Sequence, residues 1–396
     1  MPICPLWMQF DPLWHNARMP SPASSPPFSP AALRRALVIK LRHHGDVLLA
    51  APVLSTLRQF APQCEIDALV YADTAPMLAG HPALAELHLI DRAWKRQGPL
   101  RQALAEARLL SCLTARRYDL VIHLSVHTRG AWLVRLLRPR WSVAPRYRPG
   151  FWENSFTHLY PAQSHPDRPT VDTNLDSLRA LGLEPSRDEA RVILVPGAAA
   201  EAKMAALLAA HGLSAGGFIH LHPTSRWLFK CWPAERVAAL SRELAARGWP
   251  LVFTAAPEER ERAMMAQILD ELGRPGVSPT PTFFDFSGRF SLKELAALTA
   301  KARLFVGVDS APMHIAAAMG TPTVAIFGPS GEREWGPWQV TQRIVTSTAH
   351  ACRPCGRAGC NDSKISECLT TLPVAQVLAA CDELLALPVA ARSAAG

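Results

Sequence analysis

Short apolar runs alternate with helical patterns along two stretches of the chain, and this alternation is typical of parallel βαβ units. In the first stretch we expect strands at 36–41, 65–70, 87–90 and 120–124. In the second stretch we expect strands at 218–222, 251–255, 283–286, 304–308 and 323–327. The pattern therefore predicts an α/β protein built from two doubly wound domains.

The expected helices lie between these strands. We place them at 47–60, 100–116, 234–247, 258–272, 291–302, 313–319 and 374–387. Ser291 followed by Glu294 forms a capping-box pattern, which marks one helix start. A polar, proline-containing stretch at 184–188 is the expected domain boundary. This gives a first domain at 34–187, a second at 188–373, and a final helix with a short tail at 374–396.

The first 33 residues form a separate segment. They contain eight prolines and no continuous apolar core after a basic start, so we expect a disordered tail and not a secretory signal. No uninterrupted apolar run of about 18 residues occurs, so no transmembrane helix is expected. The nine cysteines, in a chain without an evident signal, favour a reducing compartment.

Positive charge is concentrated in one region of the chain. The net charge is +9, and residues 92–148 hold thirteen Lys and Arg against Glu106 and Asp119. This excess either serves solubility or contacts an anionic partner such as a membrane surface, a phosphorylated glycolipid or nucleic acid. No zinc-finger or RNA-recognition signature is present, so we do not expect nucleic acid as a partner.

Polar residues follow the strand at 304–308. Asp309 and Ser310 come directly after it, and an Ala-rich helix carrying His314 follows. Pro312 in the first turn and Gly320 past the end fit the usual helix boundaries. The first N–H groups of such a helix have no helical partner, so the strand–turn–helix is suited to bind a phosphate.

Three other strand ends carry candidate site residues. Asp46, after the first strand, is either a helix N-cap or a general base. Thr224, Ser225 and Lys230 form either a pyrophosphate site or an ordinary polar loop. Glu258 either binds ribose hydroxyls or only complements a helix dipole. Because parallel strands end at one edge of a sheet, we expect these residues to line a shared cleft.

Missing motifs and a cysteine cluster narrow the possible chemistry. The chain has no G-x-G-x-x-G, no P-loop and no Asp-x-Asp pair, so a leaving diphosphate would be neutralised by Lys230, hydroxyls and helix N-termini without an obligatory metal. Four clustered cysteines have roughly the spacing of a zinc site, although reduced thiols or a labile disulfide are favoured over zinc. These are Cys352, Cys355, Cys360 and Cys368.

Three segments together resemble one family of sugar transferases. Residues 38–49, 222–232 and 306–317, with Phe327–Gly–Pro329, resemble the ADP-heptose:lipopolysaccharide heptosyltransferases of glycosyltransferase family 9. The resemblance spans about residues 36–388 and is closest to the heptosyltransferase III branch. The cysteine cluster looks like one in the heptosyltransferase II branch.

The resemblance implies a GT-B fold, with two Rossmann-like domains and a C-terminal helix packed back on the first. It also implies inverting transfer of heptose from ADP-heptose to the inner core of lipopolysaccharide, without a required cofactor. Asp46 would be the catalytic base, and Glu258 or the adjacent Glu259 would bind ribose. The remaining donor-binding residues would be Thr224, Ser225 and Lys230 at the diphosphate, and Asp309, Ser310, Ala311 and His314 in the donor loop.

The acceptor implied by the resemblance is a phosphorylated lipid A-core at the cytoplasmic face of the inner membrane, which makes the enzyme cytoplasmic and peripheral. A set of basic residues would meet this acceptor and the membrane: Arg42, His43, Arg135, Arg138, Arg140, Arg146 and Arg148. Two alternatives are a GT-B-like nucleotide-sugar epimerase or hydrolase, and a non-catalytic protein that binds nucleotide sugars.

Overall fold

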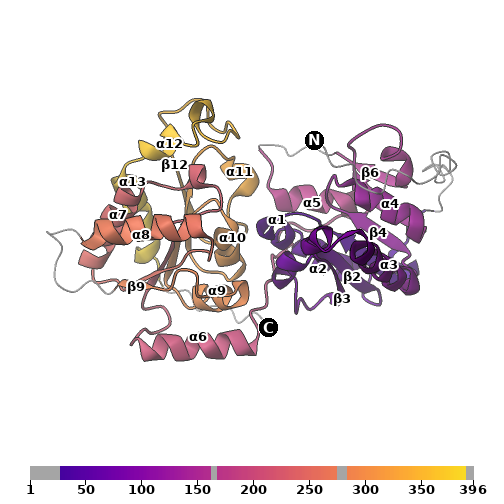
Figure 1. Ribbon diagram of the computed structural model, residues 1–396, viewed down its shortest axis with the longest axis horizontal. Helices are drawn as coiled ribbons and strands as arrows, with labels where there is room; N and C mark the ends of the chain where they lie inside the picture. The colour runs from indigo at the N-terminus through magenta and orange to yellow at the C-terminus, as the bar shows by residue number, and fades with distance from the viewer. Residues whose placement is uncertain (1–26, 162–166, 274–282, 389–396) are drawn as a thin grey trace.

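The chain folds around two six-stranded sheets in which every strand pair is parallel. The computed structural model describes residues 27–161, 167–273 and 283–388. In Figure 1 the first half of the chain, in indigo to magenta, lies on the right, and most of the second half lies on the left. The predicted α/β class with two doubly wound sheets is confirmed.

Each sheet begins in its middle and extends first to one side and then to the other. The first sheet holds β1 (Arg35–Ile39), β2 (Glu65–Tyr71), β3 (Leu84–Ile90), β4 (Leu120–His123), β5 (Trp141–Pro145) and β6 (His158–Tyr160), in the order β3-β2-β1-β4-β5-β6. The second holds β7 (Ile219–His222), β8 (Leu251–Phe253), β9 (Phe283–Asp285), β10 (Leu304–Val308), β11 (Thr323–Phe327) and β12 (Gln342–Thr346), in the order β12-β11-β10-β7-β8-β9. The strand order reverses between β1 and β4 and between β7 and β10, and open α/β sheets bind ligands at such topological switch points.

All nine predicted strands are present, and three further strands were not predicted. The first of these, β5, ends in a proline, which argues against a central strand in sequence patterns. The edge strand β6 is only three residues long, and β12 carries exposed polar side chains. Short or partly polar edge strands give a weak apolar pattern, so the sequence alone did not mark them.

Helices cover the faces of the sheets. They are α1 (His44–Leu48), α2 (Ala51–Phe60), α3 (Pro99–Arg116), α4 (Thr128–Leu137), α5 (Thr170–Arg179), α6 (Ala198–Ala210), α7 (Ala234–Ala246), α8 (Glu259–Gly273), α9 (Leu292–Thr299), α10 (Ala311–Ala318), α11 (Glu332–Trp335), α12 (Glu367–Thr370) and α13 (Val374–Ala386). The predicted helix at 47–60 is divided into α1 and α2, with Pro52 in the first turn of α2. Both hydrogen bonds of the capping box at Ser291 and Glu294 form at the start of α9.

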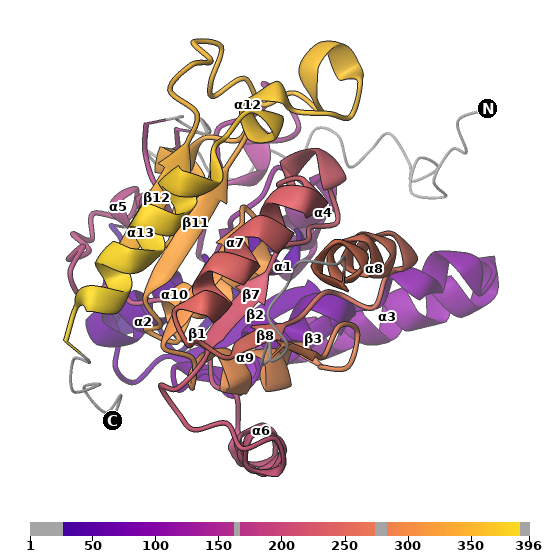
Figure 2. The same cartoon turned by 90° about the vertical axis from the view of Figure 1, so that its left-hand side faces the viewer.

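The structure corrects two of the domain predictions. The final helix, α13, packs on the second sheet beside α7 and not on the first domain, because Val377, Cys381 and Leu384 join the apolar core there (Figure 2). Most of the predicted tail, residues 1–26, lies outside the described residues. Its last part is ordered, since Phe28 packs edge-on against Trp141 at 5.3 Å and Leu33 is buried.

The two halves of the chain also contact each other. The Nζ of Lys293 on α9 donates to the carbonyl of Ala79, 2.7 Å away, and the indole N–H of Trp338 donates to the carbonyl of Ala190 at 2.8 Å. Apolar residues from 183–194 pack in the first core, so the predicted boundary at residue 187 lies inside a segment that contacts the first half. The two halves also meet where α1 packs against α10.

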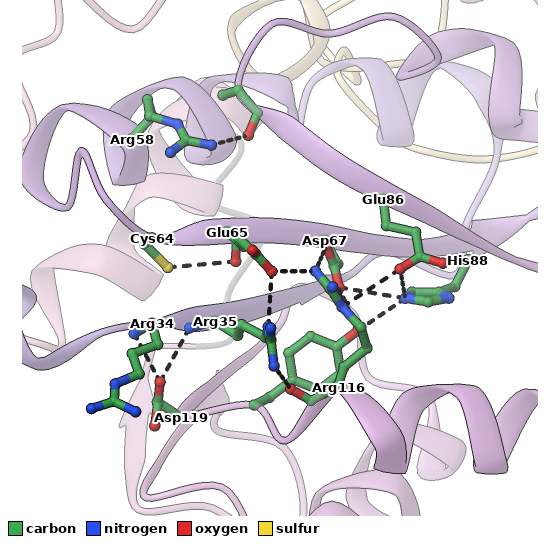
Figure 3. A network of polar contacts seen from close by, with 12 residues as sticks. Arg34, Arg35, Arg58, Cys64, Glu65, Asp67, Glu86, His88, Arg116 and Asp119 are labelled. Carbon is green, nitrogen blue, oxygen red and sulfur yellow. Dashed lines mark hydrogen bonds and ion pairs between the residues drawn. The ribbon is translucent and has the colours of Figure 1, made fainter.

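A network of charged residues lies near the amino ends of β1, β2 and β3. Asp67 is completely buried and accepts hydrogen bonds from Arg116 at 2.8 Å and from the Tyr118 hydroxyl at 2.7 Å. Arg116 also reaches Glu65 and Glu86, and Figure 3 shows its guanidinium among these acids. Burial alone would raise the pKa of Asp67, but the hydrogen bonds from its neighbours lower it overall.

The same network contains the only group in the described residues whose spacing could suit a metal ion: Asp67, Glu86 and His88. The Arg116 guanidinium already supplies a positive charge there, 2.8 Å from Asp67 and 3.5 Å from Glu86. The arrangement is therefore an ion-pair network that fastens the end of α3 to the sheet.

Replacing Arg116 with Met should lower the free energy of unfolding by about 3 kcal/mol, because it leaves the buried Asp67 carboxylate without its ionic partner. Urea denaturation followed by tryptophan fluorescence measures this. Arg343→Met is the matched control: Arg343 pairs with Glu383 at 2.5 Å on an exposed surface, so its loss should cost less than about 1 kcal/mol. Equal losses in the two variants would contradict the structural role of Arg116.

Candidate functional site

Asp46 lies at the carboxyl edge of the first sheet, in the first turn of α1. The N-cap of this helix is His43, so the N-cap interpretation of Asp46 is wrong. The Asp46 carboxylate is mostly buried, with its side chain 13% exposed, and Arg42 approaches it at 3.5 Å from the solvent side. A short helix directly after β1 thus fixes a carboxylate beside the point where the strand order reverses.

Helix α10, in the second half, lies directly against α1. An added side chain at Gly45 would meet the ring of His314 at 3.0 Å, so α1 and α10 approach closely only because residue 45 has no Cβ. His314 is buried, its Nδ1 has no hydrogen-bond partner, and burial lowers the pKa of its ring. Asp46 and Asp309 both act electrostatically on this ring, which places the two predicted carboxylates around one histidine.

Lys230 and Asp309 form an ion pair at 2.6 Å. Lys230 ends the short 3-10 helix η8 (Leu228–Lys230), and Asp309 follows β10, so the pair joins two segments that are far apart in the sequence. The Asp309 side chain is only 6% exposed, whereas that of Lys230 is 23% exposed. The Lys230 ammonium is therefore the more accessible partner, and the nearly buried Asp309 carboxylate holds it in place. Ser310, the N-cap of α10, and Ala311, its first residue, are both half-buried beside this pair.

The hydroxyl of Thr224 does not face the solvent. Thr224 is fully buried and donates to Glu261 on α8 at 2.7 Å. Burial raises the pKa of Glu261, and the bond from Thr224 opposes this in part. Ser225 is also buried, and its hydroxyl accepts a hydrogen bond from the backbone N–H of Trp227 at 3.3 Å. Both hydroxyls therefore stabilise the loop that carries Lys230.

Glu258, the predicted ribose-binding acid, is exposed just before α8. Glu261, three residues further along, is the acid that turns inward. Its position in the first turn, one helical turn from Glu258, is a signal that could have identified it from the sequence. Lys40 is the second unpredicted polar residue near the site. It interrupts an apolar strand pattern and is buried at the carboxyl end of β1.

The predicted basic residues do not form one surface. Arg138 and Arg140 come just before β5, whereas Arg146 and Arg148 come just after it. A strand of five residues separates the two pairs by about 17 Å. Arg135 lies on α4, with its guanidinium over the Phe151 ring at 4.7 Å. Only the second pair lies at the same edge as Asp46. Other basic residues at this edge, Arg92 after β3 and Arg129 after β4, were not predicted as acceptor contacts.

The four clustered cysteines are free thiols. Cys352 and Cys355 are exposed, Cys360 is half-buried and Cys368 is buried. Within the described residues, no three of these sulfur atoms lie within 4.8 Å of one another. A tetrahedral thiolate site needs Zn–S distances of about 2.3 Å, so these thiols do not form a ready-made zinc site.

No helix in the described part of the chain combines the length and the apolar character needed to cross a membrane.

Comparisons with known proteins identify the family to which this chain belongs. The family model for glycosyltransferase family 9 (heptosyltransferase) matches residues 107–366. Lipopolysaccharide heptosyltransferase 3 of Escherichia coli (strain K12) is 34% identical over 351 residues, which cover 87% of this chain and 96% of the relative. The chain belongs to glycosyltransferase family 9. The predicted resemblance to the heptosyltransferase III branch is also confirmed by this relative.

Solved structures of family 9 glycosyltransferases share the fold. One from Veillonella parvula has a TM-score of 0.75 at 22% identity, with 91% of this chain and 99% of that chain covered. The ADP-heptose lipopolysaccharide heptosyltransferase II of E. coli has a TM-score of 0.69 at 19% identity, with 89% and 98% covered. The predicted GT-B fold of two Rossmann-like domains is therefore confirmed.

Replacing Gly45 with Val should slow this family 9 glycosyltransferase roughly tenfold to hundredfold, because displacing a catalytic group by about 1 Å can cost that much. The new side chain would push α1 away from His314 on α10. The rate of nucleotide release from the donor measures the effect. Gly273→Val is the control, since no heavy atom lies within 4 Å of a Cβ there. If Gly45→Val kept full activity, the close approach of the two helices would not matter for catalysis.

Proposed function

We propose that this chain is a heptosyltransferase III-like enzyme that transfers heptose, with inversion, from ADP-heptose to the inner core of lipopolysaccharide. The observation that carries the proposal is that α1, which holds Asp46, packs against α10, which begins just after Asp309, with an added Cβ at Gly45 only 3.0 Å from the His314 ring. A base and a donor-binding segment at facing sheet edges suit transfer between two substrates. The 34% identity with lipopolysaccharide heptosyltransferase 3 supports heptose as the sugar.

The second half would bind the donor. The Lys230 ammonium would neutralise the diphosphate, and the first N–H groups of α10, including those at Ala311, would add hydrogen bonds. Asp309 would accept hydrogen bonds from heptose hydroxyls, and Ser310 and His314 would complete the donor loop. Thr224 and Ser225 would stabilise the loop that carries Lys230, and Glu261 accepts a hydrogen bond from the Thr224 hydroxyl. Glu258 remains the proposed partner of the ribose.

The first half would bind the acceptor and carry the base. Asp46 would take the proton of the acceptor hydroxyl while its oxygen forms a bond to the anomeric carbon. The bond from that carbon to the phosphate oxygen breaks, and ADP leaves with the electron pair. Lys230 would stabilise the negative charge on ADP. In this mechanism no metal ion or cofactor is required for that stabilisation. Because the displacement is single, the configuration at the anomeric carbon inverts.

Two other functions lead to different products. A nucleotide-sugar epimerase or hydrolase would convert ADP-heptose without any acceptor, and a binding protein would convert nothing. The membership of glycosyltransferase family 9 favours transfer over both.

We further propose that the enzyme works at the cytoplasmic face of the inner membrane as a peripheral protein. Arg146 and Arg148 lie at the carboxyl edge of the first sheet, and with Arg42 and His43 they would face the phosphorylated lipid A-core. Arg135, Arg138 and Arg140 would add a longer-range attraction to anionic lipid.

Incubation with ADP-heptose and a panel of truncated lipopolysaccharide cores should add one heptose to one of the cores, as read by mass spectrometry. Release of free heptose or of an epimer without a core would show the hydrolase or epimerase instead. Asp46→Asn should reduce transfer by about a hundredfold to ten-thousandfold, the usual contribution of a general base, and leave the melting temperature nearly unchanged. Near-normal transfer by a folded Asp46→Asn variant would refute the base assignment.

Binding to vesicles that contain anionic lipid should weaken as salt rises, because the Debye length shortens to about 8 Å at 0.15 M ionic strength. Co-sedimentation at increasing NaCl measures this. The double variant Arg146→Gln, Arg148→Gln should bind less tightly than Arg333→Gln, a control at an exposed position in α11. Binding that does not depend on salt would contradict the proposed electrostatic contact.

A further inference from the structure

Helix α3 carries two leucines on the side that faces away from the core. Leu100 is 81% exposed and Leu104, one turn further along, is 59% exposed, which makes them the two most exposed large apolar side chains in the described residues. Leu113 is the only buried residue of α3, all of which is described. It follows Leu104 by about two and a half turns, so the two side chains point to opposite sides of the helix. The exposed leucines therefore have no place in the core.

The first turns of α3 project from the edge of the sheet that carries the candidate site. Because α3 follows β3, it begins at the carboxyl edge of the first sheet. Glu106 pairs with Arg129, in the first turn of α4, at 2.6 Å, so about two turns of α3 extend past the start of that neighbouring helix. Arg116 and the buried Leu113 fasten the other end. In Figure 2, α3 reaches beyond the other labelled helices at the right of the view.

Cations without acidic partners surround the leucines. Residues 92–108 hold five Lys and Arg and one acid, Glu106, whose partner is Arg129. Arg92 pairs with Asp73, and the other four cations make no ion pair within the described residues: Lys95, Arg96, Arg101 and Arg108. Three of these four lie in or just before the first turn of α3, where the helix dipole disfavours positive charge and no acid is present. Their charge therefore does not stabilise the helix, and it suits an anionic partner.

Direct contacts join the same segment to the loop that carries the proposed base. Arg92 begins the 3-10 helix η6 (Arg92–Arg96), which leads into α3, and its guanidinium donates to the carbonyl of Arg42 at 3.3 Å. Its ionic partner is Asp73, whose carbonyl lies 3.0 Å from the Nε2 of His44, the first residue of α1. A surface that held the start of α3 would therefore lie beside the proposed acceptor side of the site.

We propose that the start of α3 inserts into the surface of an anionic membrane, with Leu100 and Leu104 among the acyl chains and the four cations among the headgroups. Leucines on the outer face of a helix with Lys and Arg beside them are typical of an interfacial anchor.

The charge and the leucines together select this partner. An acidic protein or a nucleic acid would satisfy the cations but leave the leucines in water, and a second copy of the chain would bring like charges together. An anionic bilayer matches both features. This inference rests on the proposed function, because it concerns how the enzyme reaches an acceptor that is held in a membrane.

The test measures binding to vesicles of phosphatidylethanolamine with a minor fraction of phosphatidylglycerol, at low and at high salt. The double variant Leu100→Gln, Leu104→Gln should bind roughly tenfold to hundredfold more weakly at both salt concentrations, because two leucines no longer leave water. Arg101→Gln, Arg108→Gln should bind roughly tenfold more weakly at low salt only, because salt screens the charges. Leu387→Gln, at a position 41% exposed in the second half, is the control and should bind like the wild type. All five side chains are exposed, so the melting temperatures should stay the same.

Unchanged binding by the leucine variant, or a loss confined to low salt, would overturn the proposal. The same holds if that variant turns a dimer into a monomer in sedimentation velocity, since the leucines would then form a subunit contact. Hydrogen exchange of the wild type needs no substitution: the backbone amides of residues 99–105 should exchange more slowly when vesicles are present. Equal exchange with and without vesicles would also overturn the insertion.

Vesicle binding needs neither donor nor acceptor, so it fails or succeeds independently of the proposed function. Failure of the wild type to transfer heptose would refute the function and not the anchor. With an acceptor held in vesicles the leucine variant should transfer heptose more slowly than the wild type, whereas with a core oligosaccharide freed of its lipid the two should be equally fast. An equal loss of rate with both acceptors would show that the leucines act on the site itself, against the proposal.

Discussion

The close approach of α1 and α10 is the constraint on which the rest of the site depends. Gly45 allows it, because any side chain there would meet the ring of His314 at 3.0 Å. The contact brings the first turn of α1, which carries Asp46, against the start of α10. Asp46 therefore lies near the Lys230–Asp309 pair. Contacts such as that of Lys293 with the Ala79 carbonyl also hold the halves together.

The repeated strand order explains why the polar groups gather where they do. In both sheets the strand order reverses beside the first strand, and each sheet leaves a gap between crossover connections at that point. In the first sheet the gap is occupied by α1 with Asp46, and Lys40, which directly follows β1, lies at the same edge. In the second, η8 and α10 supply Lys230 and the donor loop. The Arg116 network lies at the opposite edge, so the charges that stabilise the fold are separated from those proposed to bind substrates.

The sequence predicted those features that local patterns determine. Buried strands such as β1 and β10 give unbroken apolar runs, and the residues that follow them fall at the functional edge whatever the details of packing. Features set by tertiary contacts were missed. The inward position of Glu261, which was not predicted, depends on which face of α8 meets Thr224. The placement of α13 depends on which sheet face the other helices leave uncovered. The basic residues around β5 were grouped because they are close in sequence, although the strand separates them in space.

With the proposed site roles, the ion pair between Lys230 and Asp309 would make donor binding an exchange of partners. When the ammonium turned to the diphosphate, the nearly buried Asp309 carboxylate would lose its counter-charge and need new hydrogen-bond donors. A nucleotide that still carries its sugar would supply them as hydroxyls, whereas the nucleotide without its sugar would not. The free nucleotide would therefore bind less tightly than the donor, and loss of the sugar would itself promote release of the product.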